Sequence, residues 1–173
     1  LEHNRIVAEG RENEIEELLR IVEPRLKKLR SLQVDSRGFQ RQQPVLYADI
    51  GLKHLIPVTQ LGQGFNRLLT IFLAVLRSDA KILLVDEIEN GLHYTAQKAV
   101  WKGLAEAARR ADIQVFATTH SWGCIVAAHE AFAESEQYDF ALHRIQQVKG
   151  NFESVTYDRE MLESSLETEL EVR

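Results

Sequence analysis

The order of hydrophobic and polar positions divides the chain into a helical beginning and a later alternation of strands and helices. Near the N-terminus, apolar residues recur every three or four positions, which predicts an amphipathic helix that continues, with a kink at Pro24, to about residue 30. The stripe consists of Ile15, Leu18, Val22, Leu26 and Leu29. The polar stretch 36–44 predicts a loop, and a β-hairpin is expected at 45–50 and 54–59, with Pro57 confining its second strand to a sheet edge.

From Leu61 onward the pattern predicts one α/β domain with a covered parallel sheet. Residues 66–76 are apolar on nearly every face, which indicates a buried helix. The short apolar run 81–85 is typical of a strand that is covered on both faces. The further expected elements are a helix at 95–111, a second buried strand at 113–118, a helix capped by Ser121 that runs to about Phe132, a hairpin at 140–148 and 152–157, and an acidic helix from about Asp158.

Composition and charge limit the classes of protein to consider. The 173 residues, 45% hydrophobic and 27% charged, have the composition of a globular domain. The net charge of −5 provides no overall positive field toward nucleic acid or acidic membranes, so any DNA contact would need a local patch. The apolar run 68–76 is far shorter than the roughly 20 residues that span a bilayer. We therefore expect no membrane segment.

The single cysteine and the first residue add two expectations. Cys124 lies beside Trp122, Ile125 and Val126, which favours a small buried residue over a reactive thiol and fits a reducing cytoplasm. Because the chain starts at Leu1 and not at methionine, we expect it to be part of a longer protein.

The first of three chemically informative loops is the segment Leu61-Gly62-Gln63-Gly64-Phe65-Asn66-Arg67. Its two glycines permit close backbone approach, and the helix that follows directs free amides and the positive end of its dipole toward the loop. This arrangement favours an anion such as a nucleotide phosphate. A plain turn before a helix is the alternative.

The second loop follows the apolar strand and starts with two adjacent carboxylates, Asp86 and Glu87. At a strand end, Asp86 can face a Mg²⁺ ion while Glu87 lies beside a water molecule that it deprotonates. A strand end that simply enters solvent is the alternative. A metal-dependent hydrolase built on Asp86, Glu89 and His93 is a further hypothesis, although this spacing fits no regular ligand pattern.

The third loop, Thr118-Thr119-His120-Ser121, ends the second strand of the predicted sheet. A histidine there is commonly structural. However, if the two strands are parallel neighbours, His120 and the acidic pair share one edge of the sheet, where α/β proteins place their ligands.

In their order and spacing, the motifs LGQG, LVDEIENGLH and ATTHS resemble the second half of an ABC-type ATPase head. Among such heads they are similar to bacterial AAA-family ATPases of the overcoming-lysogenization-defect and RecF-like groups. The resemblance implies an α/β fold that is the C-terminal part of a P-loop NTPase head, with a mainly parallel sheet flanked by helices and an N-terminal helix and β-hairpin arm. We expect residues 1–44 to form a helical arm and loop, and residues 45–173 the C-terminal lobe.

The resemblance also implies a role for each motif. By this likeness Asp86 is the Walker B aspartate that holds Mg²⁺, Glu87 is the base, and His120 is the switch histidine that senses the γ-phosphate. The D-loop, which crosses the dimer, extends from Asn90 to His93. The signature loop, which clamps ATP held by the opposite subunit, comprises Leu61, Gly62, Gln63, Gly64, Asn66 and Arg67.

Two departures from the family pattern shape the functional expectation. Gly62 stands where transporter-type signatures carry serine, so phosphate contact would depend on backbone amides and on Asn66 or Arg67. In addition, none of the nine glycines is followed by lysine, so the chain contains no P-loop. We therefore expect one segment of a cytoplasmic ATPase that pairs with a second head, as a homodimer, and with a P-loop half that lies elsewhere. A non-catalytic partner module is the alternative, and DNA binding is only inherited from the resemblance.

Overall fold

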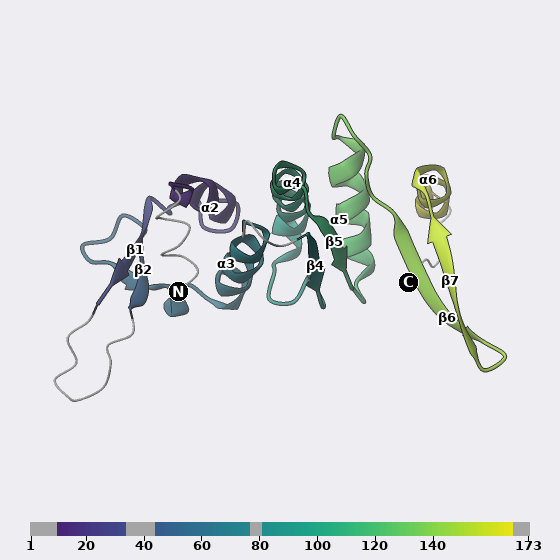
Figure 1. Ribbon diagram of the computed structural model, residues 1–173, viewed down its shortest axis with the longest axis horizontal. Helices are drawn as coiled ribbons and strands as arrows, with labels where there is room; N and C mark the ends of the chain where they lie inside the picture. The colour runs from purple at the N-terminus through teal and green to yellow at the C-terminus, as the bar shows by residue number, and fades with distance from the viewer. Residues whose placement is uncertain (1–9, 34–43, 77–80, 168–173) are drawn as a thin grey trace.

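The elements of the chain lie in a row (Figure 1). The computed structural model describes residues 10–33, 44–76 and 81–167. A small antiparallel sheet lies at one end with helices α2 (Glu12–Leu19) and α3 (Gln63–Val75) beside it, a parallel strand pair with its helices occupies the middle, and a hairpin with α6 (Arg159–Glu167) forms the other end.

The helix formed by the N-terminal apolar stripe is shorter than the stripe predicts. Helix α2 (Glu12–Leu19) ends at Leu19, and Lys28–Leu32 forms strand β1, so the predicted helix to residue 30 is wrong beyond that point. Pro24 supplies no N–H for a continuing helix. Strand β1 instead pairs antiparallel with β2 (Val45–Asp49).

A buried carboxylate joins α2 to β1. The side chain of Glu16 is only 2% exposed, and its Oε1 accepts a hydrogen bond of 2.9 Å from the backbone N–H of Leu29. Its other oxygen lies 3.3 Å from Lys28 Nζ. This pairing offsets the cost of removing the charge from water and fixes the turn between the two elements.

The predicted hairpin is confirmed over its central pairs. Strand β2 pairs antiparallel with β3 (Ile56–Pro57), and β3 is an edge strand, as Pro57 requires. The chain then forms the 3-10 turn η1 (Val58–Gln60), where the hairpin strand was expected to continue. Most of the predicted loop at 36–44 lies outside the described residues.

The predicted alternation of helices and strands is confirmed in the middle of the chain. It consists of α3 (Gln63–Val75), β4 (Ile82–Val85), α4 (Tyr94–Ala111), β5 (Gln114–Ala117) and α5 (Trp122–Ala133). Strands β4 and β5 are parallel, with Leu84 opposite Phe116. Among the described strands this is the one parallel pair, since the other two sheets are antiparallel.

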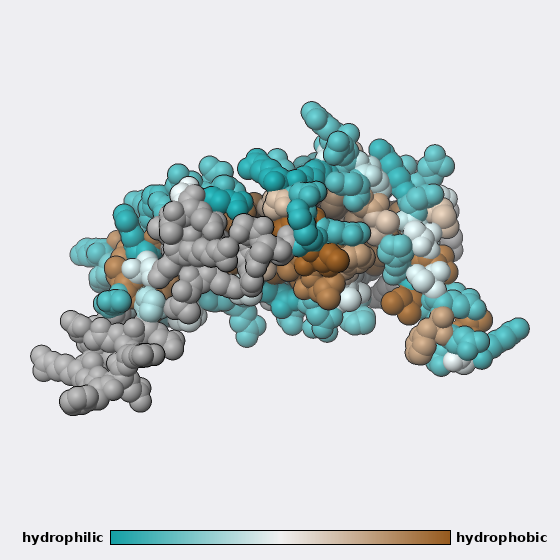
Figure 2. Space-filling model, in the orientation of Figure 1, coloured by the Kyte–Doolittle hydropathy of each residue, from teal (hydrophilic) through white to brown (hydrophobic). Residues whose placement is uncertain are grey.

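The sheet formed by β4 and β5 is covered on one face, where complete burial was predicted. Val85 is buried in the core, with Leu83, Val115 and Ala117 partly buried against it. On the opposite face Ile82 is 59% exposed, Leu84 75% and Phe116 48%. Figure 2 shows hydrophobic surface at the place that β4 occupies in Figure 1. The apolar sequence is thus more hydrophobic than the described fold requires.

The last hairpin and helix match their predictions. Strands β6 (Leu142–Val148) and β7 (Asn151–Tyr157) are antiparallel, and α6 (Arg159–Glu167) follows. At the turn, Lys149 and Gly150 both have positive φ, 51° and 86°, as the tight two-residue hairpin turn requires. Stacking of Phe132 on Phe140, with centroids 5.1 Å apart, joins α5 to the approach to this hairpin.

One hydrophobic core extends from α2 to α5. It includes Ile15, Leu29 and Phe72 together with Cys124, which is 1% exposed. The prediction of a buried cysteine is confirmed, and burial raises the pKa of the Cys124 thiol. The core and the β1–β2 pairing both cross the boundary expected after residue 44, and the division into two domains stays a prediction.

Candidate functional site

The parallel pairing of β4 and β5 brings the acidic pair and the threonine–histidine loop to the same edge of the sheet, as predicted. The hydroxyl of Thr118 donates a hydrogen bond of 2.5 Å to Asp86 Oδ1 and accepts one of 2.9 Å from the backbone N–H of Glu87. Beyond the strand ends, Ile88 N–H still donates to the carbonyl of Thr118 at 3.0 Å. Thr118, in the loop after β5, therefore orients both Asp86 and Glu87 in the loop after β4.

Glu87 adopts a backbone conformation that is unusual for its type. Its φ is +46°, in the left-handed region that residues with a Cβ seldom enter. Such a conformation costs on the order of 1–3 kcal/mol and persists where the surroundings fix it. It places the Glu87 carboxylate, an exposed group, beside Asn90, whose amide nitrogen lies 3.4 Å from Glu87 Oε2.

Glu89 connects the two loops on their inner side. Its Oε1 accepts a hydrogen bond of 3.0 Å from the backbone N–H of His120, while its buried Oε2 has no partner among the described residues. Burial raises the pKa of Glu89, but hydrogen bonds from its own backbone, from His120 and from the Thr119 hydroxyl outweigh this, and the pKa lies below its ordinary value. Glu89 therefore holds the position of His120, a role that the sequence pattern did not reveal.

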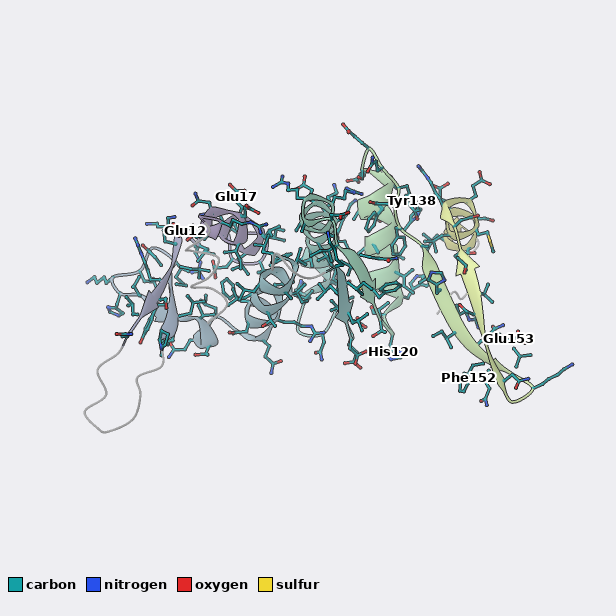
Figure 3. The ribbon with its side chains drawn as sticks, viewed as in Figure 1. Glu12, Glu17, His120, Tyr138, Phe152 and Glu153 are labelled. Atoms are coloured by element: carbon teal, nitrogen blue, oxygen red, sulfur yellow. The ribbon has the colours of Figure 1, made fainter. Side chains whose placement is uncertain are left out.

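His120 itself is exposed at the end of β5. Figure 3 shows it at the lower edge of the molecule, at the same end of β4 and β5 as the acidic loop. Its backbone is positioned by the bond to Glu89 and by the helix that Ser121 caps, where Ser121 Oγ accepts from Cys124 N–H at 3.3 Å. An exposed imidazole at this edge can donate a hydrogen bond to a bound anion.

Gly62 and Gly64 of the first loop are each required to be glycine, for different reasons. Gly62, the N-cap of α3, has φ +90° and ψ 167°, a conformation open only to glycine. At Gly64 the constraint is space, because an added Cβ would lie 2.4 Å from the carbonyl oxygen of Gly91. The loop 61–67 therefore packs, backbone against backbone, on the segment 90–93 of the same chain.

Asn66 and Arg67, which were expected to contact phosphate, make hydrogen bonds within the chain. The amide nitrogen of Asn66 donates to the carbonyls of Gly62 at 2.7 Å and Val58 at 3.1 Å. Arg67 Nη2 donates to the carbonyls of Asp86 and, at 2.8 Å, of Glu87. Gln63 is exposed at the first position of α3, where the helix amides are open to an anion.

The three side chains of the alternative metal centre are not brought together. Among the described residues no group of three or more His, Cys, Asp or Glu side chains is arranged to hold a metal ion. His93 instead caps α4, with its Nδ1 2.8 Å from the Thr95 hydroxyl. Glu89 is directed to His120, as described above.

A family model described as "AAA domain, putative AbiEii toxin, Type IV TA system" matches residues 8–123. The chain belongs to this AAA-domain family. A curated relative, the ATP/GTP phosphatase of Helicobacter pylori (strain ATCC 700392 / 26695), is 30% identical over 88 residues, which make up 49% of this chain and 24% of that protein. The chain thus matches about a quarter of the length of this relative.

Solved structures of SMC ATPase heads share the fold. One chain, from work on ATP-driven dimerization and DNA-stimulated activation of SMC ATPases, superposes with a TM-score of 0.62 at 14% identity, over 100% of this chain and 99% of that one. A second, an Smc head bound to the C-winged helix domain of ScpA, has a TM-score of 0.61 at 15% identity, over 88% of this chain and 44% of that one. The chain has the α/β fold of a P-loop NTPase head of this kind. No helix in its described part is both long and apolar enough to cross a membrane.

Proposed function

We propose that this chain is one part of an ATPase head that binds and hydrolyses MgATP between two heads. The observation that carries the proposal is the meeting of Asp86, Glu87 and His120 at one edge of the sheet, with Thr118 orienting the two acidic residues. Two comparisons support the proposal: the chain belongs to an AAA-domain family, and the relative from Helicobacter pylori is an ATP/GTP phosphatase.

Within this proposal each residue has a distinct task. The exposed Asp86 carboxylate offers the hard oxygen ligand that Mg²⁺ prefers, and its hydrogen bond from Thr118 fixes its direction. The metal supplies charge stabilisation for the transferred phosphoryl group. Glu87 accepts a proton from the attacking water, and His120 donates a hydrogen bond to the γ-phosphate.

The same chain presents a second surface to the opposite head. The N-terminus of α3 at Gly62 and Gln63, together with the D-loop from Asn90 to His93, faces the γ-phosphate of ATP held by the partner head in this proposal. The packing of Gly64 on Gly91 makes these two segments one continuous surface. A homodimer of heads is the arrangement that we propose.

The P-loop comes from another part of the complete ATPase, by which we mean this chain together with the part that carries the P-loop. None of the nine glycines is followed by lysine, so the β- and γ-phosphates have no cradle here. The open apolar face of Ile82, Leu84 and Phe116 supports the presence of a covering lobe, because strands of parallel sheets are buried on both faces. By itself the chain is nearly inert toward ATP.

The substitution Glu87→Gln in the complete ATPase tests this function. We expect ATP binding to persist while turnover falls by roughly two or more orders of magnitude, the contribution of a positioned general base. Equilibrium binding of MgATP and steady-state phosphate release measure the two quantities. Glu153→Gln, on the exposed face of β7 far from His120, is the matched control and should hydrolyse ATP normally.

Parental turnover in folded Glu87→Gln protein would contradict the assignment of Glu87 as the base. It would favour the alternative, in which the chain is a partner module that offers its signature surface to an ATP-loaded subunit without hydrolysing ATP itself.

A further inference from the structure

Arg67 joins two elements that are distant in sequence. It lies on α3, at the last position of the signature loop, and its Nη2 donates hydrogen bonds to the backbone carbonyls of both Asp86 and Glu87, the latter at 2.8 Å. Hydrogen bonds from a guanidinium are charge-assisted and stronger than those between neutral groups. The side chain thus connects the helix of the signature loop to the end of the strand that carries the acidic pair.

The conformation of Glu87 requires such support. Its φ of +46° is held only if neighbouring groups fix the backbone on both sides. The N–H of Glu87 is held by the Thr118 hydroxyl at 2.9 Å, and its carbonyl also accepts from Asn90 N–H at 2.9 Å. Arg67 completes the set, because it donates to the carbonyls of both Asp86 and Glu87.

The geometry also argues against Arg67 as a phosphate ligand. Nη2 of Arg67 is used on the two carbonyls, and its Nε is buried with no partner among the described residues. A phosphate contact through Nη2 would have to compete with both carbonyls.

We propose that Arg67 is a positioning residue that keeps Glu87 in its left-handed conformation and so couples the signature loop of a head to the base of the same head. The inference rests on the proposed function, because it assigns Arg67 a task relative to that base. When the opposite head's nucleotide contacts the loop at Gln63 and Gly64, α3 transmits the displacement through Arg67 to Glu87. The two composite sites of a dimer are thereby linked.

The test compares three variants of the complete ATPase. Arg67→Met removes the hydrogen-bond donors and keeps an apolar side chain. Arg67→Lys keeps a cation that can donate to two carbonyls. Arg110→Met is the control, because Arg110 is exposed and its ion pair with Glu106 is long, at 3.8 Å. Steady-state kinetics gives kcat and KM for ATP. ATP-dependent pairing of heads is measured by sedimentation in the Glu87→Gln background, and a thermal melt checks folding.

We expect Arg67→Met to lower kcat by about 10- to 100-fold, the cost of a small misplacement of a catalytic group. KM should stay within about threefold, because a residue that acts only on the chemical step does not change ground-state binding. Pairing of heads should be unchanged, Arg67→Lys should recover most of kcat, and Arg110→Met should match the parent.

Three results would overturn the inference. A raised KM and lost pairing of heads in Arg67→Met would make Arg67 a ligand of the opposite head's phosphate. An unchanged kcat in Arg67→Met would remove its positioning role. A folded Arg67→Lys as inactive as Arg67→Met would show that restoring the donors is insufficient. If Arg67→Met does not fold, the folded lysine variant decides alone. Failure of Glu87→Gln to lower turnover would instead overturn the proposed function, whatever the Arg67 variants do.

Discussion

At the residue scale, the site depends on side chains that hold other residues in place. Thr118 orients Asp86 and Glu87, and Glu89 holds the backbone of His120. Each of these bonds joins residues of the chain itself. Preorganised groups of this kind cost no rearrangement when the reaction takes place.

The lowered pKa of Glu89 makes its contribution to stability depend on pH. A carboxyl group whose pKa is lower in the folded than in the unfolded chain stabilises the fold above the ordinary value of 4.5, and this stabilisation is lost as the pH falls through the folded value. Glu89→Gln should therefore lower the melting temperature at pH 7, and the difference from the parent should shrink in acid below pH 4.5. Melting curves of the complete ATPase from pH 7 to pH 3 measure it, with Glu153→Gln as the control for loss of a surface charge. A difference that is constant over this range would contradict the assigned role.

At the element scale, the start of α3 and the D-loop behave as one unit because Gly64 lies against Gly91. A Cβ at Gly64 would meet the Gly91 carbonyl oxygen at 2.4 Å, so the backbone of one loop must move. Gly123 is at the same position of α5, the second residue of the helix, but a Cβ there meets nothing closer than Ser121 Oγ at 3.7 Å. The two glycines thus form a matched pair.

Gly64→Ala is expected to destabilise the protein by roughly 1–3 kcal/mol, the usual cost of forcing atoms into a filled space, and to lower ATP turnover. Gly123→Ala should be neutral or stabilising by up to about 1 kcal/mol, because alanine favours helix. Chemical denaturation with parallel turnover assays would show the contrast. Equal stability of the two variants would mean that the Gly64–Gly91 contact does not constrain the loops.

Local sequence patterns predicted most elements but not the contacts that pair them. Leu26 and Leu29 are buried, as the apolar stripe predicted, but both lie beyond the end of the helix. The pattern missed this because Leu29 pairs with Ala48, a long-range contact that periodicity does not encode. In the site, motif spacing identified the acidic pair and His120. It did not identify the bonds from Arg67 or Glu89, since these join residues about 20 to 30 positions apart.

At the scale of the whole molecule, the open face of the β4–β5 sheet is the main sign that the head needs another lobe. Leu84 is 75% exposed although it lies in an unbroken apolar strand. If the P-loop part covers this face, Leu84→Lys should destabilise the complete ATPase by about 1.5–3 kcal/mol, the value of burying one large aliphatic side chain. Leu52→Lys, at an exposed leucine in the turn before β3, is the control. Equal denaturation midpoints for the two variants would mean that the face stays open.

The central claim, a composite site shared by two heads, is tested most directly by mixing two inactive variants of the complete ATPase. Glu87→Gln lacks the base, whereas Gln63→Glu places a carboxylate at the start of α3, where it suits the helix dipole but repels the phosphate of the opposite head. In a mixed dimer, one site keeps an intact base and faces an intact loop. We predict that ATP turnover, strongly reduced in either variant alone, returns in part when the two are mixed. No recovery in dimers shown by affinity tags to be mixed would contradict action between heads.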